Sequence, residues 1–344
     1  VQDSPITVVY TPLHGSGNVP VQHLLKQVGI TCIVVEAQQE PDGNFPTVTL
    51  PNPEHPQAMS MAIQLAKEKK ADIVLGTDPD ADRLGIAIPC SDSKDEYTLL
   101  SGNQIAALLV DYLVSADKEK QLEKTPLVVK SLVTTDLVKA IVEGQNGRCK
   151  DVLTGFKYIA EQIAVLEGPQ GEGEYFLFGC EESYGYLSLN QVRDKDAVSS
   201  ALLSVEMMCY WAKQGMSLQQ RLQQIYQTWG YYTEAVFSKD YEGAKGKEKM
   251  AHIMATLRKL RAGDVLAKQT IQSIEDLQDG QQKAFPRSDV LIIRFKNGDK
   301  LVVRPSGTEP KIKYYLFFTT SAEERKEFER NLDARIETYK VALS

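Results

Sequence analysis

Three aspartates occupy alternate positions in the segment 77–83, Thr-Asp-Pro-Asp-Ala-Asp-Arg. Carboxylates this close repel one another unless a cation lies among them, and hard divalent ions such as Mg²⁺ prefer oxygen ligands. The spacing therefore predicts a divalent-metal site at Asp78, Asp80 and Asp82, with Arg83 beside it as a phosphate ligand. A calcium loop of the EF-hand type does not fit, because it requires Gly where this chain has Arg83 and Glu where it has Pro89. A solvated acidic turn is the plain structural alternative.

A second polar segment, Arg-Pro-Ser-Gly-Thr-Glu-Pro at 304–310, lies between two strand-like runs. A guanidinium, hydroxyl groups and a glycine that lets backbone N–H groups approach are what binds a phosphate dianion. The segment therefore predicts a phosphate-binding loop. A loop of this composition that only turns the chain is the alternative.

A third segment, Gly-Cys-Glu-Glu-Ser-Tyr-Gly at 179–185, follows an apolar strand-like run. Ligand sites in open α/β sheets lie at the carboxyl ends of the strands. Adjacent carboxylates and a serine at such a place are able to accept hydrogen bonds from neighbouring sugar hydroxyls, so the segment predicts a sugar-binding loop. A polar β-turn is the alternative.

Two basic side chains also lie where strands are expected to end. Lys130 closes the apolar run Pro-Leu-Val-Val-Lys, and burial there lowers the pKa of an ammonium so that it can shuttle protons. A surface lysine whose stem covers apolar groups is the alternative. His14 lies on the first turn after a strand, where a lone histidine more often caps the turn than catalyses.

The elements that position these residues alternate between strand and helix over the first two hundred residues, which predicts a parallel sheet with helices on both faces. The Pro-rich stretch 41–56 cannot be helix or central strand. The expected elements are strands at 6–10, 30–36, 73–75, 84–88, 126–131, 151–153 and 174–179, and helices ending near 29, 115, 143 and 166 and spanning 57–70 and 193–211.

From about residue 228 the pattern changes to alternating strand-like runs at 289–295, 297–304 and 311–318, with helices around 244–261 and at the end. The Asn297-Gly298 pair between two of these runs is typical of a β-hairpin. This part is therefore expected to be an α+β domain with an antiparallel sheet.

Composition narrows the class of protein. The 344 residues are 42% hydrophobic and 25% charged, with a net charge of -7 and no basic track for nucleic acid. Five scattered cysteines without a CxxC spacing indicate reduced thiols in the cytoplasm. No run reaches the ~20 apolar residues of a bilayer helix, and no signal pattern opens the chain. The chain begins with Val1 instead of Met, and a strand-like run already starts at residue 6. We therefore expect a fragment of a longer protein.

Four of the segments occur together and in order, TPLHGSG, GTDPDADR, GCEESYGY and RPSGTEP, with TGFKYI and VRDKDAV between them. Over essentially its whole length the chain resembles the α-D-phosphohexomutase superfamily, in particular its phosphoglucomutase/phosphopentomutase branch. The resemblance implies two consecutive α/β domains, 1–98 and 99–227, and a C-terminal α+β domain, 228–344, corresponding to the second, third and fourth domains of the family.

The resemblance also implies the chemistry. A phosphoserine passes its phosphoryl group to glucose 1-phosphate or glucose 6-phosphate, and the glucose 1,6-bisphosphate that forms returns its other phosphate to the serine. Mg²⁺ is the cofactor. Asp78, Asp80 and Asp82 would hold the metal. The catalytic candidates are Lys130, Arg83 and His14. The substrate-binding candidates are Glu181, Ser183, Thr154, Gly155, Lys157, Arg304, Ser306, Gly307 and Thr308. Cys180 stands where the family usually has a glycine before the first Glu of the sugar loop.

The family's nucleophile loop, of the form Thr-x-Ser-His-Asn-Pro, is missing around each of the four histidines. We therefore expect the nucleophile on an N-terminal domain of the same protein that this sequence does not contain. A phosphopentomutase or a hexose-1,6-bisphosphate synthase on the same site, and a non-catalytic Mg²⁺- and phosphosugar-binding fragment, remain alternatives. A metal-dependent phosphatase fits less well, because the aspartate loop lacks the DxDx(T/V) form.

Overall fold

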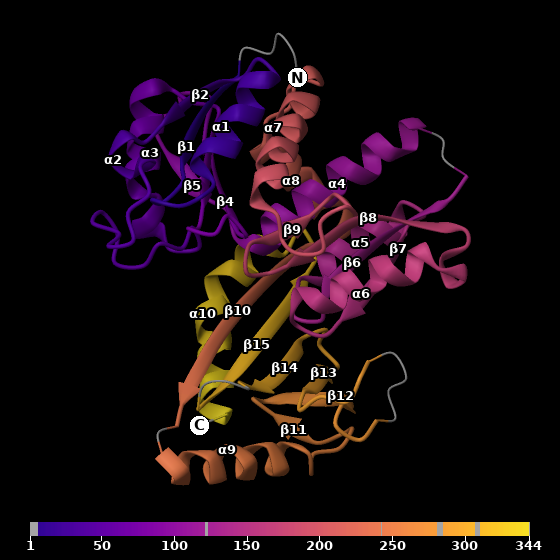
Figure 1. Ribbon diagram of the computed structural model, residues 1–344. Helices are drawn as coiled ribbons and strands as arrows, with labels where there is room; N and C mark the ends of the chain where they lie inside the picture. The colour runs from indigo at the N-terminus through magenta and orange to yellow at the C-terminus, as the bar shows by residue number, and fades with distance from the viewer. Residues whose placement is uncertain (1–5, 121–122, 242, 281–284, 307–309, 344) are drawn as a thin grey trace. The chain divides into compact units, whose positions relative to one another are not determined.

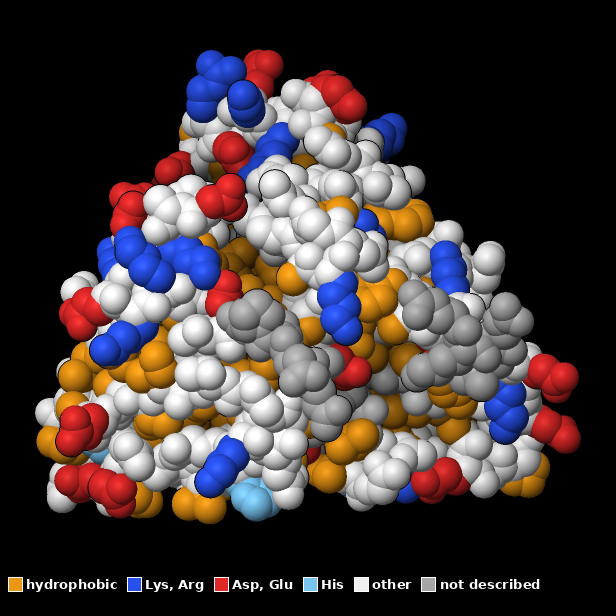
Figure 2. Space-filling model, turned by 90° about the horizontal axis from the view of Figure 1, so that it is seen from above, with side chains coloured by type: hydrophobic (Ala, Val, Ile, Leu, Met, Phe, Trp, Pro, Cys, Tyr) orange, Lys and Arg blue, Asp and Glu red, His pale blue; other side chains and the backbone are white. Residues whose placement is uncertain are grey.

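The structure is a computed structural model that describes residues 6–120, 123–241, 243–280, 285–306 and 310–343. The chain divides into two units, residues 1–225 (unit 1) and residues 226–344 (unit 2), whose helices and strands are labelled in Figure 1. Acidic and basic side chains are interspersed on the face shown in Figure 2. Among the described residues, no helix combines the length and apolar character needed to cross a membrane. The division of the chain into three domains stays a prediction.

The first sheet of unit 1 has five strands in the order β2-β1-β3-β4-β5. They are β1 (Thr7–Thr11), β2 (Thr31–Val34), β3 (Ile73–Thr77), β4 (Leu84–Pro89) and β5 (Tyr97–Leu99). β1 pairs in parallel with β2 and β3, but β4 is antiparallel to both β3 and β5. The expected parallel pairing holds for β1, β2 and β3 but not for β4, because the short loop from Asp78 to Arg83 cannot make the crossover that a parallel pair requires.

Three helices belong to this half: α1 (Asn18–Gln27), α2 (Glu36–Gln39) and α3 (Pro56–Lys69). α3 starts with proline, whose missing N–H costs no hydrogen bond at that position, and it ends at Lys70 with a left-handed φ of 52°. Its buried face packs on β1 and β3. Of the Pro-rich stretch 41–56, residues 41–55 contain neither helix nor strand, as expected, and Pro56 is the first residue of α3.

The second half of unit 1 has a four-stranded sheet in the order β7-β6-β8-β9, in which only β9 is antiparallel. Its strands are β6 (Thr125–Ser131), β7 (Arg148–Val152), β8 (Glu174–Glu181) and β9 (Gly185–Leu187). Its helices are α4 (Gly102–Lys120), α5 (Asp136–Gly144), α6 (Phe156–Glu167), the 3-10 turn η1 (Pro169–Gly171) and α7 (Ala197–Lys213). Helix α8 (Leu218–Trp229) then runs through the boundary between the two units.

Helix α7 joins the halves of unit 1. α7 follows the second half in sequence but packs on α1 and contacts β3 and β4 of the first half, whereas α4 follows the first half and packs on α5 and β8 of the second. Asp196 caps the start of α7 by accepting the N–H of Val198 at 3.0 Å. The next residue, Ala197, donates its N–H to the carbonyl of Ala81 at 3.0 Å. The start of α7 is thereby attached to the aspartate loop.

Unit 2 has a six-stranded antiparallel sheet in the order β10-β15-β14-β13-β12-β11, which confirms the expected antiparallel architecture. The strands are β10 (Tyr231–Asp240), β11 (Val265–Leu266), β12 (Gln269–Asp276), β13 (Leu291–Phe295), β14 (Lys300–Pro305) and β15 (Lys311–Thr320). The Asn297-Gly298 pair turns between β13 and β14, and Gly298 takes a φ of 87° there. Side chains of α9 (Gly243–Leu257) and α10 (Arg325–Ala342) pack with alternate residues of the central strands, so both helices lie on one face.

Candidate functional site

The three aspartates of the loop between β3 and β4 converge. Asp78, Asp80 and Asp82 each present a carboxylate oxygen, and these oxygens lie within 4.8 Å of one another. Asp78 is buried, Asp82 is half-buried and Asp80 is exposed, so the cluster is open to solvent on one side. A set of hard oxygen donors with an open side fits Mg²⁺, which keeps several of its waters when it binds proteins.

Backbone hydrogen bonds shape this loop. The Oδ1 atom of Asp78 accepts the N–H groups of Asp82 at 3.0 Å and of Arg83 at 2.9 Å, and Ala81 takes a left-handed φ of 58°. The carbonyl of Pro79 in turn accepts the N–H of Ser16 at 2.8 Å. The loop is thus closed on itself and held by the first turn of the chain.

The charged form of Asp78 is disfavoured where no cation is bound. The pKa of Asp78 is raised to about 7, mainly by burial. The backbone N–H of Arg83 lowers this pKa, and the neighbouring Asp82 and Asp80 raise it. A cation among the three carboxylates would favour their charged forms, because it offsets both the burial and the mutual repulsion.

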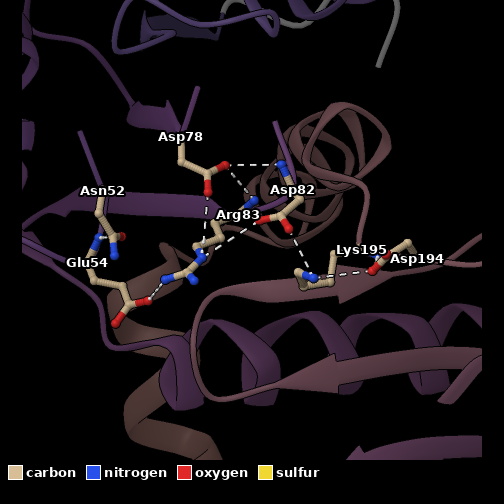
Figure 3. Close-up of polar contacts among 7 residues, drawn as sticks. All are labelled: Asn52, Glu54, Asp78, Asp82, Arg83, Asp194 and Lys195. Atoms are coloured by element: carbon tan, nitrogen blue, oxygen red, sulfur yellow. Dashed lines mark hydrogen bonds and ion pairs between the residues drawn. The ribbon is translucent and has the colours of Figure 1, made fainter. Parts of the chain in front are cut away.

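Two basic side chains flank the aspartates (Figure 3). Arg83 places its Nε atom 3.5 Å from Oδ2 of Asp78 and 3.7 Å from Oδ1 of Asp82. Lys195 places its Nζ atom 3.0 Å from Oδ2 of Asp82. The sequence reasoning did not single out Lys195, although it lies in the quoted segment VRDKDAV. Only the fold brings it to the loop.

The predicted sugar loop lies next to the aspartate loop. Arg83 forms an antiparallel bridge with Gly185, and Leu84 donates its N–H to the carbonyl of Tyr184 at 3.0 Å. Glu181 is buried at the end of β8, where its Oε1 atom accepts the N–H of Gly155 at 2.7 Å. Two of the predicted segments, together with the start of α6, are therefore joined within unit 1.

The same loop contains the second of the two adjacent carboxyl groups that the sequence associated with sugar hydroxyls. Glu182 is half-buried and accepts a hydrogen bond from the Ser131 hydroxyl at 3.1 Å. Burial, and after it the charge of the adjacent Glu181, raise its pKa to about 7, although the hydrogen bond from Ser131 lowers it. Cys180, at the position of the family's glycine, is buried on β8 opposite Tyr186, so the departure is accommodated inside the sheet.

The expected lowering of the Lys130 pKa is wrong. The Lys130 side chain is completely buried, and its Nζ atom lies 2.7 Å from Oδ1 of Asp151 and 3.1 Å from Oδ1 of Asp136. Burial alone lowers the pKa of this ammonium, but Asp136 and Asp151 raise it by more, so its pKa lies above the ordinary lysine value. An ammonium held by two carboxylates fits a structural ion pair, and a catalytic role for Lys130 stays a prediction.

The start of α6 places three of the substrate-binding candidates. Gly155 takes a φ of 120°, which a residue with a side chain adopts only under strain. The Oγ1 atom of Thr154 is buried, and no hydrogen-bond partner for it lies among the described residues. Lys157 is exposed, with its Nζ atom 4.8 Å from the centre of the Tyr158 ring. Their role in binding a substrate stays a prediction, as does that of Ser183 on the neighbouring loop.

Contacts within unit 1 account for His14. It takes a left-handed φ of 61° in the turn after β1 and is buried. One ring nitrogen lies 3.2 Å from the carbonyl of Glu40 and the other 2.8 Å from the hydroxyl of Thr47. These contacts fix the turn, which matches the turn-capping alternative, and a catalytic role for His14 stays a prediction.

The predicted phosphate loop belongs to unit 2. Arg304 lies at the end of β14, opposite Lys313 of β15, and Ser306 donates its N–H to the carbonyl of Lys311 at 2.8 Å. Gly307 and Thr308 lie outside the described residues. Like charges directly across a strand pair repel, so the Arg304–Lys313 pair favours an anion beside it. The sequence reasoning missed Lys313, because cross-strand register is not visible in a single strand.

Comparisons with known proteins place the chain in a family. Residues 1–91 match the family model of phosphoglucomutase/phosphomannomutase alpha/beta/alpha domain II, residues 101–229 that of domain III, and residues 247–334 that of the C-terminal domain. A phosphoglucomutase from Staphylococcus aureus strain MRSA252 is 39% identical over 328 residues. The match covers 92% of this chain and 57% of the relative, so the chain spans little more than half of that protein's length.

Solved structures share the fold. The crystal structure of the exocytosis-sensitive phosphoprotein pp63/parafusin, a phosphoglucomutase from Paramecium in its open form, is similar with a TM-score of 0.66 and 16% identity, over 99% of this chain and 58% of that one. The Aspergillus fumigatus N-acetylphosphoglucosamine mutase in complex with GlcNAc-6P and magnesium is similar with a TM-score of 0.53 and 14% identity, over 96% of this chain and 66% of that one. Since models of three domains of one family match most of its length, the chain belongs to the phosphoglucomutase/phosphomannomutase family of the α-D-phosphohexomutase superfamily.

Proposed function

We propose that this chain is the metal-, sugar- and phosphate-binding part of a cytoplasmic phosphoglucomutase, which interconverts glucose 1-phosphate and glucose 6-phosphate through a phosphoserine and glucose 1,6-bisphosphate. The phosphoserine is supplied by an N-terminal domain of the same protein. The observation that carries the proposal is the junction of the aspartate loop with the sugar loop through Arg83 and Gly185, in a chain 39% identical to a phosphoglucomutase. Turnover of glucose 1-phosphate by the full-length protein tests it.

Mg²⁺ is the proposed cofactor, held by Asp78, Asp80 and Asp82. When bound, it neutralises charge on a phosphoryl group in transfer. A solved relative, the Aspergillus fumigatus mutase, was crystallised with magnesium, which supports this choice. Arg83 then contributes a guanidinium to the same phosphoryl group, and Lys195 holds Asp82 in place.

Two further sets of residues bind the substrate in this proposal, one in each unit. Glu181, oriented by the N–H of Gly155, and Ser183 accept hydrogen bonds from sugar hydroxyls. Arg304, with Ser306, Gly307 and Thr308, binds the phosphate that is not transferred. Phosphoryl transfer depends mainly on positioning and charge neutralisation, and these residues supply both.

Replacing Asp80 by asparagine is expected to abolish most of the stabilisation by Mg²⁺. A ligand that binds only the folded state raises the unfolding free energy by RT ln(1 + [L]/Kd), about 2.7 kcal/mol at a hundredfold excess over Kd. Because Asp80 is exposed, its replacement by asparagine leaves the stability of the metal-free fold unchanged. Only the Mg²⁺-dependent shift in melting temperature is therefore affected. The control is Asp92→Asn, an exposed aspartate in the loop after β4. An undiminished Mg²⁺ shift in Asp80→Asn excludes the site.

Replacing Arg304 by alanine is expected to weaken binding of glucose 6-phosphate by about tenfold or more. The substitution removes a charge-assisted hydrogen bond to the phosphate, worth about 1.5–3 kcal/mol. Isothermal titration calorimetry on this chain measures the change. Arg294→Ala, on the neighbouring strand β13 and paired with Glu275, is the matched control. Equal affinity in Arg304→Ala and the unmodified chain rejects the assignment.

A further inference from the structure

We propose that Glu54 is a positioning residue for the metal site: its hydrogen bond to Arg83 keeps the guanidinium from closing further onto Asp78 and Asp82, so that their carboxylates are available to a divalent cation. This inference rests on the proposed Mg²⁺ site. Glu54 acts through Arg83 and is not itself a metal ligand. It lies in the Pro-rich stretch between α2 and α3, where the sequence reasoning expected only an irregular connection.

Arg83 is shared among three carboxylates (Figure 3). Its Nη1 atom lies 2.6 Å from Oε1 of Glu54, whereas its Nε atom lies 3.5 Å from Asp78 and 3.7 Å from Asp82. The short contact is a charge-assisted hydrogen bond, and the two longer ones are ion pairs beyond hydrogen-bond length. Glu54 is therefore the preferred partner, and it sets the distance between the guanidinium and the aspartates.

A guanidinium this close to the aspartates competes with any bound cation. It satisfies the same carboxylates that a metal would use and repels a metal of like charge. Without Glu54, the ion-pair partners of the guanidinium that remain among the described residues are Asp78 and Asp82, so Arg83 is expected to close onto them. Lys195, the second cation that contacts Asp82, differs in this respect, because its Nζ atom lies 3.0 Å from Asp82 and 3.2 Å from Asp194.

The segment that carries Glu54 is fixed in place. Asn52 accepts the N–H of Glu54 on its Oδ1 atom at 2.9 Å. Pro53 is buried against the start of β4, where a Cβ atom on Gly85 would lie only 2.7 Å from the Cβ atom of Pro53. Glycine at position 85, two residues after Arg83, thus allows Pro53 to pack directly on the strand. The Glu54 side chain is 30% exposed and Arg83 35%, so the pair is partly shielded from solvent.

The test is the Mg²⁺ affinity of this chain, measured by calorimetry and by the Mg²⁺-dependent shift in melting temperature. Glu54→Gln is expected to raise the Kd for Mg²⁺ at least about fivefold, and Glu54→Asp, which keeps the charge on a shorter side chain, by less. Glu167→Gln is the matched control, because Glu167 forms an ion pair of 2.5 Å with Arg193 that does not involve the aspartates. This control is expected to bind Mg²⁺ as the unmodified chain does.

A double variant separates positioning from the simple loss of one negative charge. In an Arg83→Gln background, Glu54→Gln is expected to raise the Kd by less than half of its effect in the unmodified chain, because the competing guanidinium is gone. An equal rise in both backgrounds means that Glu54 acts only through its own charge and overturns the inference. Normal Mg²⁺ affinity in Glu54→Gln also overturns it and leaves the proposed metal site standing. Failure of the unmodified chain to bind Mg²⁺ overturns both.

Discussion

Replacing Lys130 by methionine is expected to lower the unfolding free energy of unit 1 by about 2–4 kcal/mol. The ammonium is buried between Asp136 and Asp151, and it also donates to the carbonyl of Thr134 at 3.1 Å. Removing one partner of a buried ion pair costs about 3–5 kcal/mol, because the remaining charges lose their counter-ion. The two carboxylates are 32% and 29% exposed, so water offsets part of that loss.

Guanidinium unfolding followed by tryptophan fluorescence measures the effect. Trp211 is buried on α7 of unit 1, so a Trp229→Phe background makes the fluorescence report on that unit. The control is Lys139→Met on α5, whose ammonium is exposed and 3.9 Å from Glu143, with an expected change within about 0.5 kcal/mol. Adding Asp136→Asn and Asp151→Asn to Lys130→Met is expected to restore part of the loss. A Lys130→Met variant as stable as the unmodified chain contradicts the ion-pair role.

Lys130 also shows where sequence reasoning about charge fails. The apolar run before it correctly indicated strand β6 and a buried strand end, and burial alone does lower the pKa of an ammonium. The pKa of Lys130 is raised instead of lowered because Asp151, on the parallel neighbour β7, lies opposite Lys130 in the strand register. Register between strands is a tertiary property, so a single sequence shows the burial of Lys130 and not its counter-ions.

The elements that the sequence predicted well are those with long apolar periodicity. β1, α3, β6 and α7 fall close to the expected ranges, because each buries one continuous face. It missed α8 and β12, of 12 and 8 residues, and three short strands at sheet edges: β5 and β9 have three residues each, and β11 has two. Such strands are set by their neighbours, and too few residues remain to show an alternation.

The same distinction applies to the site. The aspartate loop was predictable because its three carboxylates lie within five consecutive residues, so local spacing alone brings them together. Two groups around the loop were not predictable: Glu54 contacts Arg83 from 29 residues away in the sequence, and Lys195 contacts Asp82 from the end of the second half of unit 1. Glu54 is placed by the packing of Pro53 on β4, and Lys195 by the packing of α7 on strands of both sheets. Neither contact produces a pattern in the local sequence.

This 344-residue chain by itself is expected not to interconvert glucose 1-phosphate and glucose 6-phosphate, with a rate on the order of 10⁴-fold or more below that of the proposed full-length enzyme. No serine of the chain has the surroundings of the family's nucleophile. Ser16 donates its hydroxyl to the carbonyl of Pro79, Ser131 donates to Glu182, and Ser183 and Ser306 lie in the predicted sugar and phosphate loops. Without a covalent carrier the phosphoryl group would have to pass directly between two sugars.

A coupled assay with Mg²⁺ and a catalytic amount of glucose 1,6-bisphosphate, run on this chain and on the full-length protein, tests the expectation. The chain must first be shown to bind glucose 6-phosphate by calorimetry, so that a lack of turnover reflects the missing nucleophile and not a misfolded site. Turnover by the full-length protein alone then assigns the phosphoryl carrier to the N-terminal domain, because every other proposed element of the site lies within the 344 residues. Comparable turnover by both would place the nucleophile inside this chain and contradict the proposed division of roles, since an alcohol needs a neighbouring base or metal to attack phosphorus at that rate.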